Sequence, residues 1–226
     1  MPQSGYGKIR IFEDFLAGED IIANTAATRP FGGSGLRVLG QGSAENDSGI
    51  TVGEFSNGNG VGIFTTTNED AHSCGVATGK VFDAGNMGTI SIECRVQFPD
   101  LDTKAFYFGF TDENADAVIL EGTNLVASGA SLTLSASDLC GFLLDSEATD
   151  DEDWIMVYNG GTTTGETTIA NIDADEDATA GEFQVLRLEV DTNGTARWYI
   201  DGKLKQTVAG AMSTSEDLAV IALLEA

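Results

Sequence analysis

Carboxylates are the residues of this 226-residue chain best suited to chemistry, and there are 36 of them. Glycoside hydrolysis needs two of them in one cleft, about 5–5.5 Å apart in retaining enzymes. Glu189 and Asp191 are candidates, because residues i and i+2 of a strand share a face. The third carboxylate of an E-x-D-x-x-E strand would stand at Gly194, which is a turn residue. We therefore expect no catalytic residues and predict that the protein is not an enzyme.

His72 and Cys74 form a second pair of interest, because they resemble a nucleophile and its base. They share a strand face, but no Asn or Asp is identifiable to orient the histidine, so an incidental polar residue is the simpler interpretation. The cysteines (Cys74, Cys94 and Cys140) lack the spacing of a disulfide framework or a zinc site. Free buried thiols are the favoured interpretation, with one disulfide as the alternative.

A third motif concerns metal binding. Asp173, Asp175 and Asp177 match the opening of an EF-hand calcium loop. Ala178 and Gln184 stand where that loop needs Gly and Glu, and no helices flank it. An acidic, solvated turn is the simpler interpretation. Calcium stays as a candidate at these three aspartates, and we expect no other cofactor or metal.

Carbohydrate binding would require exposed aromatic rings with polar neighbours over a sheet. Trp198 shares a face with Leu188, so we expect it in the core. Trp154 follows an acidic loop and is the better exposed candidate, and Tyr158 lies on the same strand. We therefore take Trp154 and Tyr158 as the residues for glycan contact. The full set of candidate rings is Tyr107, Trp154, Tyr158, Trp198 and Tyr199.

The elements that must position these residues are clearest at residues 183–208, FQVLRLEVDTNGTARWYIDGKLKQTV. Three alternating runs separated by the turn signals T-N-G and D-G predict an antiparallel meander. A three-residue first loop, with Gly194 in the left-handed conformation, gives a consistent register. It pairs Glu189 with Arg197 on one face, and Val190 with Ala196, Leu188 with Trp198 and Leu186 with Ile200 on the other. The second loop is either a two-residue Asp201-Gly202 turn or a longer one that includes Lys203.

The rest of the chain reads as short strands and turns, with 28 glycines, three prolines and no extended helical periodicity. We predict one all-β domain over residues 9–226, preceded by a flexible arm at 1–8. One short helix is a candidate near 115–120, and an acidic loop is expected at 171–178. The other predicted strands are 8–15, 36–39, 50–55, 61–67, 90–98, 105–111, 140–144, 154–158, 162–169 and 218–224.

The net charge of the chain limits the classes of partner that it can bind. Eleven basic and 36 acidic residues give a net charge of −25, which repels nucleic acid and anionic membranes alike. The first fifteen residues lack the apolar core of a signal peptide, and the longest apolar run, 218–224, is too short to span a membrane. Basic and acidic residues balance within residues 1–40. A neutral N-terminal part that touches a partner is therefore one interpretation.

Three segments also support a family resemblance: SIECRVQF followed by FYFGFTDE, then GFLLDSEATDDEDWIMVYNGG, then FQVLRLEVDTNGTARWYIDGKL. In this order, over residues 90–208, they resemble the concanavalin A-like lectin/glucanase (LamG-like) jelly-roll domains of tailed-phage virion structural proteins. The opening IFEDFLAGE resembles the first strand of that family. The resemblance implies an all-β fold of two antiparallel sheets, a jelly-roll sandwich.

It also implies a non-enzymatic decoration protein on the outer surface of a tailed-phage capsid, made in the host cytoplasm. The expected partners are the major capsid protein or another virion protein, and further copies of the chain in a homo-oligomer, of which a trimer is one candidate form. Tyr6 and Lys8 of the arm, and Arg10 just after it, are the predicted contact residues. The alternative is a carbohydrate-binding module on a phage fibre or a cell surface, with a surface glycan as its partner.

Overall fold

The computed structural model describes residues 11–15, 21–22, 29–31, 35–42, 48–54, 60–69 and 71–226. The predicted arm and its contact residues, Tyr6, Lys8 and Arg10, lie outside these ranges. Antiparallel strands dominate the described residues, as predicted. The strands are β1 (Ile21–Ile22), β2 (Arg29–Phe31), β3 (Leu36–Leu39), β4 (Gly49–Glu54), β5 (Gly60–Thr65), β6 (Ser73–Ala77), β7 (Ile90–Val96), β8 (Ala105–Thr111), β9 (Leu125–Ser128), β10 (Ser131–Leu134), β11 (Leu139–Asp145), β12 (Asp153–Asn159), β13 (Asp173–Asp177), β14 (Gln184–Val190), β15 (Ala196–Ile200), β16 (Lys203–Val208) and β17 (Ala219–Glu225).

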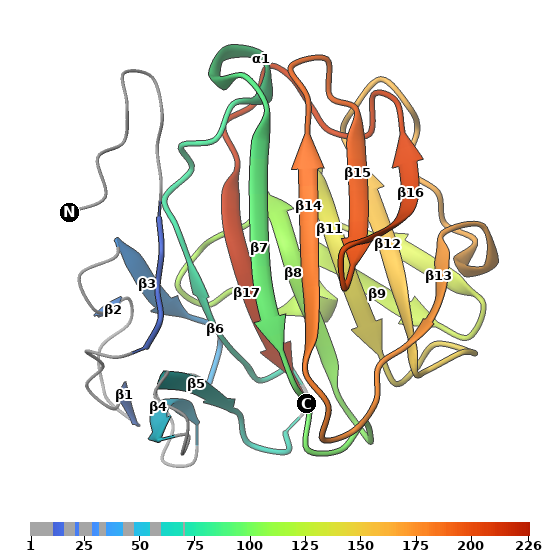
Figure 1. Cartoon of the computed structure of the whole chain (residues 1–226). Helices are drawn as coiled ribbons and strands as arrows, with labels where there is room; N and C mark the ends of the chain where they lie inside the picture. The colour runs from blue at the N-terminus through green and yellow to red at the C-terminus, as the bar shows by residue number, and fades with distance from the viewer. Residues whose placement is uncertain are drawn as a thin grey trace.

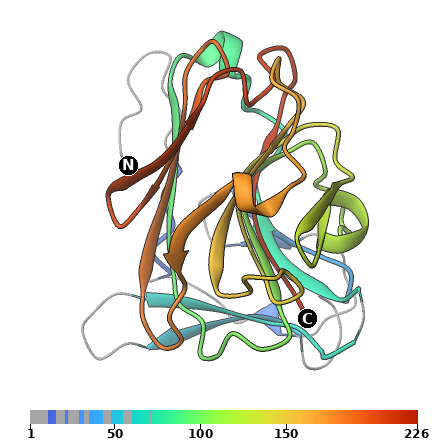
Figure 2. The ribbon, with the colours of Figure 1, turned by 90° about the vertical axis from the view of Figure 1, so that its right-hand side faces the viewer.

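Two packed sheets form the body of the molecule. The larger has the order β13-β12-β11-β8-β17-β6-β3-β2 and the smaller has the order β16-β15-β14-β7. Figure 1 shows the smaller sheet lying in front of the larger one, and Figure 2 shows the two layers from the side. A third sheet, β1-β4-β5, and the β9–β10 hairpin complete the described strands. The predicted two-sheet sandwich is therefore confirmed.

The C-terminal strand β17 lies in the middle of the larger sheet, between β8 and β6. Its apolar run AVIALL suits this place, because a central strand is covered on both sides and needs no polar face. The strand predicted at 218–224 is thus confirmed within one residue.

Aromatic rings fill the space between the two sheets. Trp154 of β12 lies 6.1 Å from the Phe98 ring and 6.4 Å from the Phe142 ring, as measured between ring centroids. Trp198 of β15 donates a hydrogen bond from its indole Nε1 to the carbonyl oxygen of Gly141, at 2.8 Å. Its burial agrees with the prediction, and the bond satisfies the one polar atom of a ring that is otherwise surrounded by apolar groups.

The far side of the larger sheet is also covered. The π-helix η1 (Leu120–Asn124) and the β9–β10 hairpin lie there, the first visible as the yellow-green coil in Figure 2. The 3-10 helix η2 (Ile169–Asn171) lies at the edge of the sandwich, between the hairpin and β16. Apolar side chains of these segments are buried: Val118, Leu120, Leu125, Leu132, Ile169 and Ile172. The larger sheet therefore has no open face over its strands β8, β11 and β12.

Two buried carboxylates hold this cover in place. Glu225 of β17 accepts a hydrogen bond from the backbone N–H of Leu120 at the start of η1. Asp145 of β11 accepts from the backbone N–H of Ala127 (3.3 Å) and of Glu147 (2.9 Å). Such partners are needed, because a buried carboxylate without hydrogen bonds destabilises the folded state.

The predicted meander is confirmed in register as well as in topology. β14 pairs with β15 so that Leu188 lies opposite Trp198 and Glu189 opposite Arg197. Gly194 has a φ of +76°, the left-handed conformation expected of the three-residue loop. The second loop is the two-residue Asp201-Gly202 turn, and Ile200 pairs with Lys203.

Four local predictions are wrong. Residues 11–15, the described part of the predicted strand 8–15, form no strand. Residues 162–169 form an isolated bridge, from Thr168 to Ser131, and the first residue of η2 instead of a strand. The predicted acidic loop contains β13, an edge strand, and the helix expected near 115–120 is η1 instead. Four-residue α1 (Ala84–Met87) completes the helices, and none in the described part of the chain is long and apolar enough to cross a membrane.

Candidate functional site

Burial removes most of the aromatic candidates for glycan contact. Trp154 is fully buried between the sheets, and its indole Nε1 donates to the side chain of Gln184 at 2.9 Å. Tyr158 is 7% exposed and packs against Trp198, and Tyr107 is fully buried. The prediction that Trp154 and Tyr158 contact a glycan is therefore contradicted by their positions. Of the five candidate rings, Tyr199 alone reaches the surface.

Tyr199 lies on the outward face of the smaller sheet. β14 and β15 alternate strictly, so the apolar residues Leu186, Leu188, Trp198 and Ile200 are buried between the sheets. The residues between them point outward. The two-residue Asp201-Gly202 turn sets Leu204 opposite Tyr199, and a bulge shifts the register only beyond this pair. Leu204 is 53% exposed. We call the outward set Arg187, Glu189, Arg197, Tyr199 and Leu204 the Arg–Tyr face.

Contacts within the Arg–Tyr face fix its side chains. The Arg187 guanidinium lies 4.3 Å from the centroid of the Tyr199 ring, a stacked cation–π contact. The Tyr199 hydroxyl donates to Glu189 at 3.2 Å, and Arg187 Nε lies 3.5 Å from another oxygen of that carboxylate. These groups are about one-third exposed, at 35% for Arg187 and 28% for Glu189, so they are held in place but remain accessible.

Asp191 continues the polar row at the end of β14. Arg197 binds it at 2.6 Å and, through this hydrogen bond, lowers the pKa of the Asp191 carboxyl. A carboxyl held ionised in this way cannot serve as a general acid, which needs a raised pKa. Glu189 and Asp191 thus lie on the same face of the smaller sheet, as their spacing predicts. Each carboxylate forms an ion pair with an arginine.

The smaller sheet also concentrates the positive charge of the acidic part of the chain. Of the seven basic residues after residue 40, five lie on its strands: Arg95, Arg187, Arg197, Lys203 and Lys205. Arg95 stacks over the Phe183 ring at 4.1 Å. The two lysines instead turn toward β13, where Lys205 binds Glu176 at 2.6 Å and Lys203 lies 4.0 Å from it. The arginines, and not the lysines, therefore provide the positive charge on the outward face of the smaller sheet.

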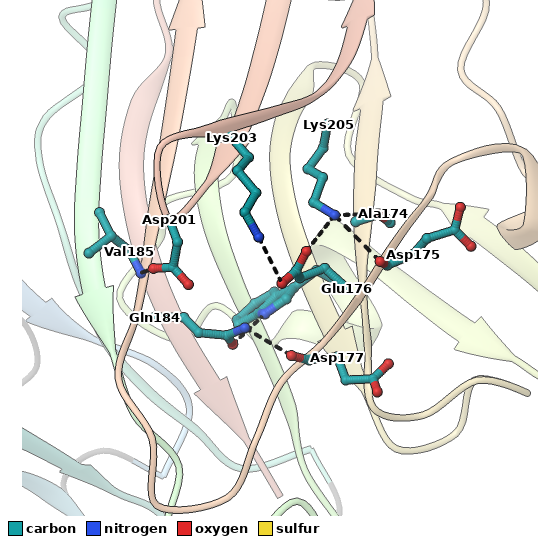
Figure 3. Close-up of polar contacts among 10 residues, drawn as sticks. Ala174, Asp175, Glu176, Asp177, Gln184, Val185, Asp201, Lys203 and Lys205 are labelled. Atoms are coloured by element: carbon teal, nitrogen blue, oxygen red, sulfur yellow. Dashed lines mark hydrogen bonds and ion pairs between the residues drawn. The ribbon is translucent and has the colours of Figure 1, made fainter.

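Strand β13 closes the edge between the two sheets (Figure 3). Lys205 of β16 donates to the carbonyl oxygen of Ala174 at 3.1 Å, in addition to its ion pair with Glu176. Gln184 donates from its side chain to the carbonyl oxygen of Asp177 at 2.8 Å and accepts the Trp154 indole N–H. The predicted calcium triplet therefore lies on an edge strand that is tied to its neighbours.

That triplet does not come together. β13 bulges against β12, and Asp175 has a φ of +47°, so its exposed side chain projects away from the strand (Figure 3). Asp173 instead lies beside Asp150 and Asp153, whose oxygens are within 4.8 Å of one another. Burial, with Asp177 and Asp173 beside it, raises the pKa of Asp153 to about 8. The spacing of residues in the sequence could not predict this cluster. Asp150 and Asp153 come from the turn into β12, which only the folded chain places beside Asp173.

His72 and Cys74 form no nucleophilic pair. The Nδ1 atom of His72 lies 2.7 Å from the Thr67 hydroxyl and 3.2 Å from Glu69. Burial raises the pKa of the Cys74 thiol to about 12, so the thiol remains protonated at neutral pH. Cys74, Cys94 and Cys140 are all free, as the favoured interpretation of their spacing predicts.

Comparison with known proteins supports the fold. No protein-family profile matches the chain, and no curated protein sequence matches it. Among solved structures, a point mutant of the Emp46p carbohydrate recognition domain is 12% identical, with a TM-score of 0.50 over 96% of this chain and 90% of that one. The chain therefore has the concanavalin A-like jelly-roll fold, as the sequence resemblance implies. Similarity at this identity extends to the fold and no further.

Two enzymes also stand among the similar structures. The β-glucanase of Bacillus licheniformis is 15% identical, with a TM-score of 0.47 over 89% of this chain and 86% of that one. A carbohydrate esterase of the Shiga toxin-encoding bacteriophage phi24B is 14% identical, with a TM-score of 0.47 over 84% and 87%. The prediction that the protein is not an enzyme is contradicted by this set, because it contains enzymes as well as lectin domains.

Proposed function

We propose that this protein binds carbohydrate on the Arg–Tyr face. The observation that carries the proposal is the position of Tyr199, the one predicted candidate ring at the surface, among outward-pointing arginine and carboxylate groups. The similar domain of Emp46p is a carbohydrate recognition domain, and we extend that class of ligand to this chain. Carbohydrate binding thus agrees with the alternative expected from the sequence, but with Tyr199 as the contact residue in place of Trp154 and Tyr158.

The chemistry of the Arg–Tyr face suits a sugar. A pyranose ring presents apolar C–H groups on its faces and hydroxyl groups around its rim. Tyr199 and the neighbouring Leu204 offer an apolar platform, and Arg187 and Arg197 offer planar donors. Glu189 supplies an acceptor beside them. A small number of fixed polar groups around an apolar surface is typical of small-molecule recognition.

Arg187 and Glu189 also restrain each other and the side chain of Tyr199. These side chains therefore lose less conformational entropy when a ligand binds. Glycan binding through such a face should tolerate physiological salt, because apolar stacking and short hydrogen bonds are screened less than long-range charge attraction.

A glycan array on the full chain at matched ionic strength tests the proposal. We expect selective binding that Tyr199→Ala removes, and that Tyr199→Phe retains in part because the ring remains. Phe12→Ala is the matched control, since Phe12 is an aromatic residue 65% exposed outside the Arg–Tyr face. Binding that survives Tyr199→Ala, or that Phe12→Ala removes, would contradict the proposal.

The predicted capsid-decoration role remains a prediction, as do the virion location and the homo-oligomer. Its contact residues, Tyr6, Lys8 and Arg10, lie outside the described residues. Co-purification of the protein with intact phage particles, at a defined copy number, is the measurement that tests it. The carbohydrate proposal does not depend on that outcome.

A further inference from the structure

A group of carboxylates lies where the loop between β11 and β12 meets β13. One oxygen each of Asp150, Asp153 and Asp173 lies within 4.8 Å of the others. Asp153 points to the side of β12 opposite Trp154, whose indole faces the smaller sheet. The group is therefore on the other side of the sandwich from the Arg–Tyr face. Oxygens at this spacing can surround one Ca²⁺ ion, whose ligands lie about 2.3–2.6 Å from the metal.

Asp153 is the unusual member. It is only 7% exposed, and no N–H group of the described residues donates to its buried Oδ1 atom. Its neighbours are the carboxyl groups of Asp173 and Asp177, which are acidic like itself. The other two buried carboxylates on this side of the sheet, Asp145 and Glu225, both accept backbone N–H groups. A buried carboxylate oxygen without a partner costs the folded state free energy, whereas a bound cation would satisfy it.

Backbone hydrogen bonds hold the three aspartates in place. The N–H of Asp153 donates to the carbonyl oxygen of Asp150 at 3.3 Å, which closes the turn that carries both. The N–H of Ala178 donates to the carbonyl oxygen of Glu152 at 2.7 Å and ties this turn to the end of β13. The N–H of Asp175 donates to Oδ1 of Asp173 at 2.8 Å and orients that carboxyl group. The site is thus built from fixed backbone on both sides.

We propose that Asp150, Asp153 and Asp173 bind a calcium ion, which clamps the β11–β12 loop to edge strand β13. Carboxylate oxygens are the ligands that hard divalent cations prefer, and the net charge of −25 raises the local concentration of cations around the protein. This ligand set differs from the sequence-predicted triplet, since Asp150 and Asp153 replace Asp175 and Asp177. The proposal does not rest on carbohydrate binding.

Calcium titration of the full chain, after treatment with a chelator and dialysis into about 150 mM NaCl, tests the site under ionic screening. We expect saturable binding of one Ca²⁺ by isothermal titration calorimetry and a rise in Tm on adding CaCl₂. Asp153→Asn should weaken Ca²⁺ binding at least about tenfold, the scale seen for loss of groups that support a metal site. The variant should remain folded, because the substitution replaces a buried acidic group by a neutral one of the same size.

Asp175→Asn is the matched control, because it removes a carboxylate from the same strand outside the cluster. An Asn there keeps the backbone bond to Asp173 and tolerates the positive φ. Three results would overturn the proposal: no saturable binding, equal losses in the two variants, or stronger binding of MgCl₂ than of CaCl₂. The first would leave an acidic cluster that holds no ion, and the second would indicate a diffuse cation atmosphere.

Discussion

At the residue scale, Trp154 and Tyr199 show how the cover of a sheet decides which rings are accessible. Trp154 opens the apolar run WIMVY after an acidic loop, whereas Tyr199 lies in the alternating run ARWYI. Trp154 belongs to a sheet covered on both sides, so either face would bury it. Tyr199 belongs to a sheet whose outward face is open. Sequence alternation predicts which residues share a face, but it does not predict which face is covered.

The buried carboxylates have the same dependence on long-range packing. Asp145 and Glu225 look like ordinary acidic residues at strand ends. Their backbone partners come from the cover around η1 and β9, a segment for which the sequence predicted only a short helix near 115–120. Sequence periodicity carries no information on such contacts, because they join segments with no fixed spacing.

Asp145 gives a prediction on pH. Burial is the main cause that raises the pKa of its carboxyl above the ordinary value, so the folded state holds the proton more tightly than the unfolded chain does. The contribution to stability is present below the unfolded pKa, near 4, and is lost as the pH rises through the folded pKa. The free energy of unfolding of the wild type should therefore fall relative to Asp145→Asn between about pH 4 and pH 7.

Urea denaturation of both proteins at each pH measures this difference, and the comparison cancels the carboxylates that they share. A gap between wild type and variant that stays constant, or that widens in favour of the wild type at higher pH, would show that the raised pKa is not a property of Asp145 in the folded protein.

At the scale of elements, the meander β14–β15–β16 was predictable because its register depends on local turn chemistry. Gly194 and the Asp201-Gly202 turn fix the pairing within a few residues of sequence. β13 was not predictable in this way. Its residues DADED have low strand propensity, and it forms only because it pairs with β12 and because Lys205 anchors it.

Two glycines of the meander give a second prediction. Gly194 (φ +76°) and Gly202 (φ +77°) are both left-handed. A Cβ at position 194 would lie 2.3 Å from the carbonyl oxygen of Met212, whereas a Cβ at position 202 would meet nothing within 4 Å. Gly202→Ala should cost about 1–2 kcal/mol from the backbone conformation alone. Gly194→Ala should cost more, since the backbone of the 210–212 segment must also move.

The free energies of unfolding of the two variants, measured in urea, test this ranking. Equal losses would mean that the approach of Met212 to Gly194 adds no constraint. A larger loss for Gly202→Ala would contradict the assignment of the two loops.

At the scale of the whole molecule, the fold was predictable and the partners were not. The order of strand motifs led to a concanavalin A-like sandwich, which the structure has. The same resemblance led to a non-enzymatic role, which is contradicted because enzymes and non-enzymatic lectins share this fold. Strand motifs report the packing of a sheet, whereas activity depends on a few side chains that the fold leaves free to vary.

Net charge gives a prediction at this scale. A charge of −25 repels itself more strongly in the compact state than in the unfolded chain. Raising NaCl from about 10 mM to about 150 mM shortens the Debye length from about 30 Å to about 8 Å, so Tm should rise. The scan is run with a chelator present, to exclude calcium. A Tm that falls with NaCl would mean that the exposed arginine and lysine ion pairs outweigh the repulsion.

The most direct test of the central claim locates the sugar on the protein. Amide chemical shifts are followed by NMR while the strongest glycan from the array is titrated into the full chain. We predict that the largest shifts occur along β14, β15 and β16 around Arg187, Tyr199 and Leu204, and that they disappear in Tyr199→Ala. Shifts centred on another part of the described structure, or unchanged in Tyr199→Ala, would contradict carbohydrate binding at the Arg–Tyr face.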